Sequence, residues 1–141
     1  MIPYGKQNID KDDIKSVIEV MESDFLTQGP KVEEFEKKFA DYIGSKYAVA
    51  VSNGTAALHL SALSLGVKSG ERVITSPITF AATANCVRYA GGQIWFADID
   101  PDTYLLCYKK TKELLESKPK GFFKGIIPVS FGGLPVNLEL F

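Results

Sequence analysis

The segment best suited to chemistry is Ser-Asn-Gly-Thr at residues 52–55, which joins an apolar run to an alanine- and leucine-rich stretch. If the run is a strand and the stretch a helix, free backbone N–H groups and the positive end of the helix dipole meet at this loop. Such a point attracts an anion, typically phosphate. Gly54 would let the backbone approach the anion closely, and Thr55 would add a hydroxyl. Because Ser and Asn also cap helices, plain capping remains the alternative.

Two further loops hold residues of interest. Phe80 follows Ser-Pro-Ile-Thr at 76–79. Its ring could lie over a flat cofactor ring, because offset aromatic stacking is favourable, and the alternative is an ordinary core phenylalanine. Asp98, Asp100 and Asp102 follow a later apolar run. Carboxylates there can hold a ligand or metal, but they also form turns and caps. The glycine and closing glutamate of a calcium loop are missing, so we expect a structural role for these aspartates.

The histidine and the two cysteines, which are residue types that often perform catalysis, are expected to have structural roles. His59 is the only histidine and lies inside an expected helix, so we expect a packed or partly exposed helix residue. Cys86 and Cys107 have neither the spacing of a disulfide framework nor that of metal ligands, and we expect ordinary partly buried thiols. No two glycines are spaced G-x-G and no G-x-x-x-x-G-K-[ST] occurs, which excludes a dinucleotide fingerprint and a P-loop.

The elements that must position these loops alternate between strand and helix patterns. Amphipathic helices are expected at 12–22 and over 32–43, the second stopping at Gly44. The remaining expected elements are strand 47–51, helix 55–65, strand 72–75, helix 79–90, strand 94–97, helix 109–117 and strand 125–129. Such alternation predicts right-handed crossovers and a mainly parallel sheet, which binds ligands at the carboxyl ends of its strands. The last residues, 137–141, are expected to start another helix, which is typical of a cut end.

Composition narrows the class of protein. The chain of 141 residues is 45% hydrophobic and 23% charged, which is ordinary for a globular domain with a core. Its formal net charge of -1 gives no basic surplus for nucleic acid. The sequence contains no apolar run long enough for a membrane span and no signal-peptide pattern, so we expect a cytoplasmic protein.

Taken in order, several segments resemble the DegT-type branch of the fold-type-I pyridoxal-phosphate aminotransferases, which act on nucleotide-linked sugars. The matching segments lie at 2–4, 26–30, 35–36, 52–60, 73–80, 82–85 and 98–100. Each match alone is weak evidence for the family. Together the matches follow the family's order over residues 2–135, which makes the resemblance specific. Within the family, Thr-Ser-Pro-Ile-Thr-Phe at 75–80 followed by 82–85 is most similar to the transaminases of the pseudaminic acid pathway.

The resemblance implies a fold, a cofactor and partners. The fold would be the N-terminal part of the fold-type-I large domain, a three-layer α/β/α arrangement with a mainly parallel sheet. Residues 1–33 would form an N-terminal helical arm and a substrate-side loop, and residues 34–141 an incomplete cofactor-binding α/β domain. The cofactor would be pyridoxal 5'-phosphate. The partners would be a UDP-linked sugar, an amino-acid donor such as glutamate and a second copy in a homodimer, with no metal, nucleic acid or membrane.

The resemblance also implies site residues. Gly54, Thr55 and Ala56 match the cradle for the cofactor phosphate, and Phe80 matches the aromatic that stacks on the pyridine ring. The positions that match the lining of the sugar-nucleotide site are Tyr4, Asp24, Phe25, Leu26, Thr27 and, again, Gly54.

No catalytic residue is expected within this chain. In relatives the Schiff-base lysine, the aspartate that pairs with the pyridine nitrogen and a polar supporting residue lie beyond the point where this sequence ends. None of the 14 lysines stands in a matching context, so the chain alone should be inactive. Two alternatives remain open: a sugar dehydratase of the same family, in which that lysine is replaced, and a non-catalytic truncated paralogue.

Overall fold

A computed structural model describes residues 5–141, and Tyr4, an expected substrate-side residue, lies outside this range. The chain divides into two compact units, Met1–Ala50 and Val51–Phe141, called the first and second unit below. The division into functional parts after residue 33 stays a prediction.

The first unit holds the two expected amphipathic helices. Helix α1 spans Lys11–Met21 and begins with a capping box, in which Asp10 accepts from the N–H of Asp13 and Asp13 accepts from the N–H of Asp10. Helix α2 spans Pro30–Ile43 and ends at Gly44, whose φ of 70° is the left-handed conformation that glycine adopts readily. Both predicted helices are therefore confirmed to within two residues at each end.

The predicted strand at 47–51 is wrong. This segment has no strand partner among residues 5–141, and its backbone groups pair with side chains instead. The N–H of Ala50 donates to the Glu36 carboxylate at 2.7 Å, and the carbonyl of Tyr47 accepts from the Ser45 hydroxyl at 2.8 Å. The apolar pattern predicted burial on both faces, yet the Val49 side chain is 75% exposed. An apolar run forms a strand only where a neighbouring strand completes its hydrogen bonds.

The contact between Glu36 and Ala50 gives a testable prediction. Replacing Glu36 by Ala should speed hydrogen exchange at the Ala50 amide by about tenfold or more, because a hydrogen bond to a charged group contributes about 1.5–3 kcal/mol. The control is Glu36→Gln, which keeps an acceptor oxygen and should speed exchange less. The measurement is amide exchange of residues 47–51 in the purified protein. Equal protection of Ala50 in the original protein and Glu36→Ala would contradict this prediction.

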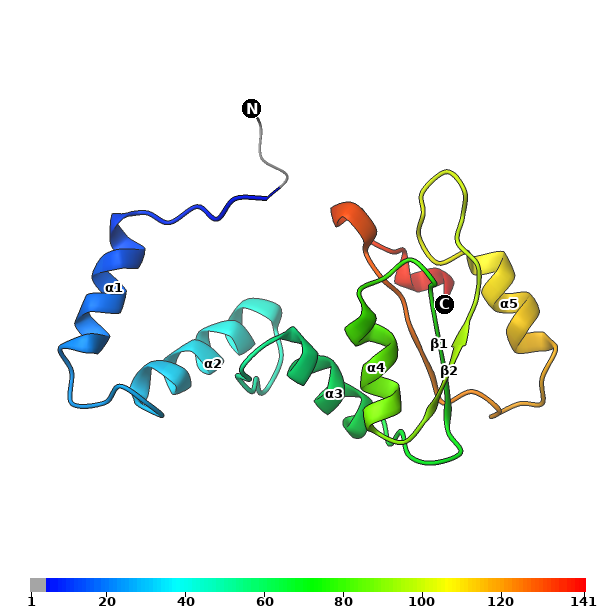
Figure 1. Ribbon diagram of the computed structural model, residues 1–141, viewed down its shortest axis with the longest axis horizontal. Helices are drawn as coiled ribbons and strands as arrows, with labels where there is room; N and C mark the ends of the chain where they lie inside the picture. Colours follow the sequence, from blue (N-terminus) through cyan, green and yellow to red (C-terminus); the bar gives the residue numbers. More distant parts are fainter. Residues whose placement is uncertain (1–4) are drawn as a thin grey trace. The chain divides into compact units, whose positions relative to one another are not determined.

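The second unit alternates helices and strands as expected (Figure 1). Its elements are α3 (Gly54–Ser64), β1 (Arg72–Thr75), α4 (Ala81–Tyr89), β2 (Gln93–Phe96), α5 (Tyr108–Glu116) and β3 (Gly125–Ile127), followed by the short 3-10 helices η1 (Phe131–Gly133) and η2 (Leu138–Leu140). The expected final strand is two residues shorter than predicted, and the expected helix at 137–141 is a single 3-10 turn.

The three strands form one parallel sheet in the order β2-β1-β3. In the register, Ile74 of the central strand stands between Trp95 and Ile126. At the carboxyl end of β1 the buried Thr75 hydroxyl donates to the carbonyl of Ile127 at 2.7 Å, which ties the ends of β1 and β3 together. Because all three strands run in one direction, the loops that leave them lie at one edge of the sheet.

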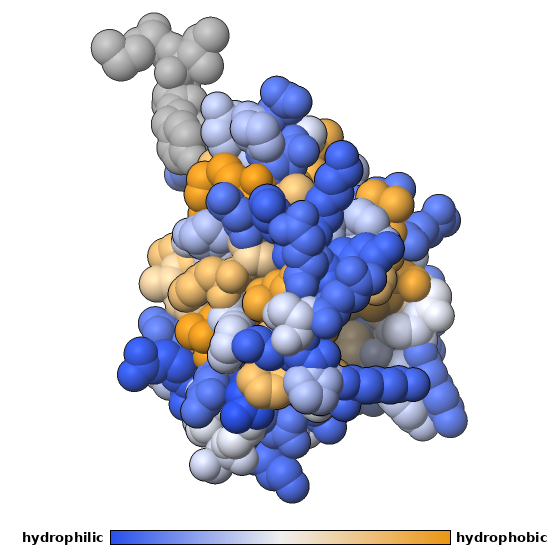
Figure 2. All heavy atoms as spheres, turned by 90° about the vertical axis from the view of Figure 1, so that its right-hand side faces the viewer, coloured by the Kyte–Doolittle hydropathy of each residue, from blue (hydrophilic) through white to orange (hydrophobic). Residues whose placement is uncertain are grey.

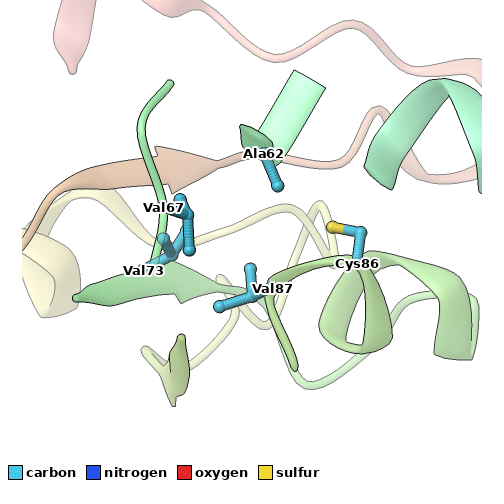
Figure 3. Close-up of a cluster of buried hydrophobic side chains, with 5 residues drawn as sticks. All are labelled: Ala62, Val67, Val73, Cys86 and Val87. Carbon is cyan, nitrogen blue, oxygen red and sulfur yellow. The ribbon is translucent and has the colours of Figure 1, made fainter. Parts of the chain in front are cut away.

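The central strand is buried on both of its faces. Val73 packs with Ala62, Val67, Cys86 and Val87, which come from α3, α4 and the segment before β1 (Figure 3). The next residue, Ile74, packs on the other face with Ala97, Leu106 and Leu114 of α5. Helices α3 and α4 thus cover one face and α5 the other, and the predicted three-layer arrangement is confirmed. Strands with a continuous apolar sequence are typical of sheets that helices cover on both faces.

Helix α5 presents charged residues outward. Thr111 is buried and Leu114 half-buried, whereas Lys110 pairs with Glu113 at 3.0 Å on the exposed side. The view onto this side of the molecule is largely hydrophilic (Figure 2). Along residues 5–141, the structure shows no helix long and apolar enough to cross a membrane.

Candidate functional site

The loop at 52–55 lies at the start of α3, as its sequence predicts. Asn53 is the N-cap: its side-chain oxygen accepts from the N–H of Ala56 at 2.9 Å, and its carbonyl accepts from the N–H of Ala57 at 3.1 Å. The expected capping role of this loop is therefore confirmed for Asn53. The N–H groups of Gly54 and Thr55 meet no acceptor within residues 5–141. Two backbone donors at a helix N-terminus remain available for an anion.

The space around Gly54 fits a phosphate group. A Cβ built on Gly54 would meet no atom within 4 Å beyond its chain neighbours and the backbone of its own helix, so the space beside Gly54 is open. The half-exposed Thr55 hydroxyl makes no hydrogen bond within the described range 5–141 and adds a third donor. Since the Ala56 N–H is already engaged by Asn53, Gly54 and Thr55 are the stronger members of the expected cradle. The roles of all three stay predictions.

Phe80 is an exposed residue and not part of the core. It is the N-cap of α4, it comes five residues after the end of β1, and its side chain is 77% exposed. The alternative of a buried phenylalanine is therefore wrong. A ring at the carboxyl end of a parallel strand, open on its face, can stack on a flat ligand. Its stacking on a cofactor stays a prediction.

Buried hydroxyl groups surround the backbone of the loop that leads to Phe80. The Ser76 hydroxyl accepts from the N–H of Ile78 at 3.2 Å, and the Thr79 hydroxyl donates to the Thr83 hydroxyl at 2.8 Å. Ser76 and Thr83 are both buried. The sequence alone predicts no function for these residues. The spacing of Thr79 and Thr83, one helical turn apart, is the only sequence signal that could have indicated their contact.

The aspartates at 98–102 form a turn, as expected. Asp100 accepts from the N–H groups of Asp102 and Thr103 and from the Thr103 hydroxyl. The hydrogen bond from the Thr103 N–H is the main cause that lowers the pKa of the Asp100 carboxyl. The Asp98 carboxylate accepts from the N–H of Ile99 at 2.8 Å. These side chains are occupied by their own backbone, which is the behaviour of turn-forming residues.

His59 and the two cysteines have structural surroundings. His59 is a half-buried residue of α3 whose ring meets Tyr89 edge-on, with ring centroids 5.7 Å apart. Cys86 is buried in the cluster around Val73, and burial raises the pKa of its thiol. A protonated buried thiol is a poor nucleophile, so Cys86 acts as a core residue, and Cys107 is half-buried. The expected roles of these residues agree with the structure.

Four of the expected substrate-side residues belong to the described part of the first unit. The loop between α1 and α2 contains Asp24, Phe25, Leu26 and Thr27, and all four side chains are exposed. Leu26 lines a cavity of about 560 Å³ whose walls come from α1 and α2. The walls include Val17, Met21 and Phe35 and are mainly apolar. The residues are open to a ligand, and their role in binding a sugar nucleotide stays a prediction.

Comparisons with known proteins identify relatives over nearly the whole chain. The sequence model of the DegT/DnrJ/EryC1/StrS aminotransferase family matches residues 7–141. The spore coat polysaccharide biosynthesis protein SpsC of Bacillus subtilis is 42% identical over 98% of this chain and 34% of its own length. The UDP-4-amino-4,6-dideoxy-N-acetyl-beta-L-altrosamine transaminase of Campylobacter jejuni is 39% identical over 99% of this chain and 36% of its own length.

The structural comparison agrees with the sequence comparison. The PLP form of the putative sugar aminotransferase Spr1654 from Streptococcus pneumoniae superposes with a TM-score of 0.85 and 28% identity, over 99% of this chain and 34% of that protein. The predicted relation to the fold-type-I pyridoxal-phosphate enzymes is confirmed. The chain spans about a third of the length of the curated relatives it matches.

Proposed function

This chain belongs to the DegT/DnrJ/EryC1/StrS aminotransferase family, and from this we propose that it holds the cofactor in an enzyme that transfers an amino group to a UDP-linked 4-keto-6-deoxy amino sugar. The cofactor is pyridoxal 5'-phosphate, the amino donor is glutamate and the product serves the synthesis of cell-surface sugars. The name of the Campylobacter jejuni relative supports this class of substrate, and that of SpsC supports a role in polysaccharide synthesis. The narrower proposal is a UDP-4-amino-4,6-dideoxy-N-acetyl-β-L-altrosamine transaminase of the pseudaminic acid pathway.

The observation that carries the proposal is the open helix N-terminus at Gly54. Two unengaged N–H groups, the Thr55 hydroxyl and the helix dipole all favour a group with negative charge. Beyond its chain neighbours and its own helix backbone, no atom lies within 4 Å of the place that a Cβ on Gly54 would take, which leaves room for a phosphate. In this proposal Gly54 and Thr55 bind the cofactor phosphate, and Ala56 completes the cradle when the Asn53 side chain yields its N–H.

Phe80 supplies the second contact to the cofactor. Its exposed ring covers one face of the pyridine ring, which orients the cofactor and excludes water from that face. When bound, pyridoxal phosphate supplies the electron sink that stabilises the carbanion formed during transamination. The residues of this chain bind and orient the cofactor, and they move no proton themselves.

The other groups of the site are proposed to come from outside the second unit. The residues proposed to contact the sugar nucleotide are Tyr4, Asp24, Phe25, Leu26, Thr27 and Gly54. In this proposal the Schiff-base lysine and the partner of the pyridine nitrogen are not among these 141 residues. The enzyme works as a homodimer. The short coverage of the relatives supports this division of the site.

Replacing Gly54 by Val tests the proposal. In the holoenzyme that contains this chain, Gly54→Val should weaken the binding of pyridoxal phosphate by about tenfold or more, or about 1.4 kcal/mol. A Cβ at this position meets no atom within 4 Å apart from its chain neighbours and its own helix backbone, so the expected loss arises from crowding the phosphate. The dissociation constant is measured by titrating the apoenzyme and following cofactor absorbance.

The matched control is Ser64→Val, which places the same side chain at the other end of α3. It should leave the cofactor affinity within about twofold of the original, because Ser64 is exposed and distant in the helix from the open N–H groups. If Gly54→Val binds the cofactor as tightly as Ser64→Val, the phosphate assignment is wrong.

A further inference from the structure

The loop between β1 and α4 combines an exposed aromatic ring with a buried polar interior. Phe80 projects into solvent, whereas Ser76 is 1% exposed and Thr83 only 6% exposed. A buried hydroxyl costs free energy unless it is hydrogen-bonded. No side-chain polar atom buried in the described part of the chain lacks a partner, so these hydroxyls are satisfied by the loop itself. Loop conformation and hydroxyl pairing therefore depend on each other.

Thr83 makes two hydrogen bonds next to Phe80, one to the Thr79 side chain and one to the Phe80 backbone. Its hydroxyl accepts from the Thr79 hydroxyl at 2.8 Å, and Thr79 is the residue before Phe80. Its N–H donates to the carbonyl of Phe80 at 3.0 Å. One residue of α4 thus binds the carbonyl of Phe80 and the side chain of the residue before it, and the backbone of Phe80 has φ -68° and ψ 142°. The direction of the Phe80 side chain follows from this extended backbone.

The ring of Phe80 depends on its backbone for its position. The aromatic pairs found between residues 5 and 141 do not include Phe80. With no aromatic neighbour to hold the ring, its place at the sheet edge is set by the loop. Aromatic stacking requires defined geometry, with ring centroids about 4.5–7 Å apart and an offset or edge contact. A loop free to shift would lose part of that stacking.

We propose that Thr83 is a positioning residue that, through Thr79, holds the Phe80 ring where it stacks on the pyridine ring of the cofactor. The inference rests on the proposed function, since it requires Phe80 to contact the cofactor. A purely structural Thr83 would stabilise the start of α4 and would affect cofactor binding equally whether or not an aromatic ring stands at position 80.

A double-mutant cycle separates these two roles. The variants are Thr83→Val, Phe80→Leu and the double variant, all in the holoenzyme, with pyridoxal phosphate as the titrant. Phe80→Leu should weaken cofactor binding about three- to tenfold, the range expected for one lost aromatic contact. Thr83→Val should weaken binding about threefold in the original background, but by less than about 1.5-fold in the Phe80→Leu background, where no ring remains to be positioned.

Two further variants serve as controls for the double-mutant cycle. Thr83→Ser keeps the hydroxyl and should restore the original affinity. Thr79→Val removes the same hydrogen bond from a half-buried residue and should reproduce Thr83→Val, which keeps the experiment decisive if Thr83→Val folds poorly. The absorbance spectrum of the bound cofactor provides a second readout, since it should shift in Thr83→Val and not in Thr83→Ser.

The inference is overturned if Thr83→Val and Thr79→Val weaken binding by the same factor with and without Phe80. It is also overturned if Phe80→Leu leaves the affinity unchanged while Gly54→Val lowers it. In that case the phosphate site, and with it the proposed function, still stands. If the unmodified holoenzyme binds no pyridoxal phosphate, the proposed function and the inference fail together.

Discussion

The 141-residue chain, prepared alone, is expected to transaminate no UDP-linked amino sugar with any amino donor. The reaction needs a lysine that carries the cofactor and moves a proton beside its phosphate cradle. In the second unit, Lys68 precedes β1 and Lys124 precedes β3, so both lie toward the amino ends of the strands. Phe80 lies at the carboxyl ends. The lysines of α5 cover the opposite face from α3, and Lys110 is paired with Glu113.

The measurement combines an activity assay with borohydride reduction of the chain and pyridoxal phosphate. No stoichiometric cofactor adduct should form at any single lysine, and no absorbance of a lysine-linked cofactor should develop. The control is the holoenzyme, which should show both. A stoichiometric adduct at one specific lysine of the isolated chain would refute the prediction and would place the catalytic group within these residues.

The isolated chain is also expected to self-associate, so that a monomer is the minor species at micromolar concentration. Strands β2 and β3 each have one edge without a strand partner in the part of the chain that the structure describes. The apolar side chains of α1 are exposed, among them Val17 and Met21, and so is Phe35 of α2. Open strand edges and apolar patches drive pairing with other chains.

Light scattering measures this association directly. A matched pair of variants on α1 shows whether its apolar face takes part: Val17→Glu should raise the share of monomer, whereas Lys15→Glu, on an exposed polar residue, should not. A stable monomer that binds little of a dye for apolar surfaces would show that these residues bury their apolar side chains without a second chain. The view of the chain as part of a larger fold would then be wrong.

The sequence predicted those elements whose signals are local. The helical spacing of apolar residues predicts α1, and Gly44 marks the end of α2, because each signal lies within the element or directly beside it. The predicted bounds of the strand Arg72–Thr75 are confirmed. This apolar run forms a strand because β2 and β3 pair with it on its two edges. The apolar run at 47–51 also has the pattern of a buried strand, but no other strand of the described residues pairs with it. The sequence of five residues does not show whether a partner strand is present.

The roles of the candidate site residues stay predictions, and for the same reason the sequence does not predict the contacts around them. The resemblance selected Gly54 and Phe80, but it could not show that the Asn53 side chain occupies the Ala56 N–H. Nor could the pattern around Phe80 show that its ring is exposed, because an aromatic before a helix suits a core as well. The pair of Thr79 and Thr83 forms only when the loop folds back over the start of α4. Such contacts depend on three-dimensional packing.

The order β2-β1-β3 has a consequence for synthesis on the ribosome. The central strand is made first, and its two neighbours follow later in the chain. The bond from Thr75 to Ile127 spans 52 residues. At about 5–20 residues per second, translation leaves one edge of β1 open for roughly 3–10 s after that strand has been made. During this interval the nascent chain exposes Val73 and Ile74 on a strand without its full complement of hydrogen bonds, so we expect this stretch to be a binding site for chaperones that act on nascent chains.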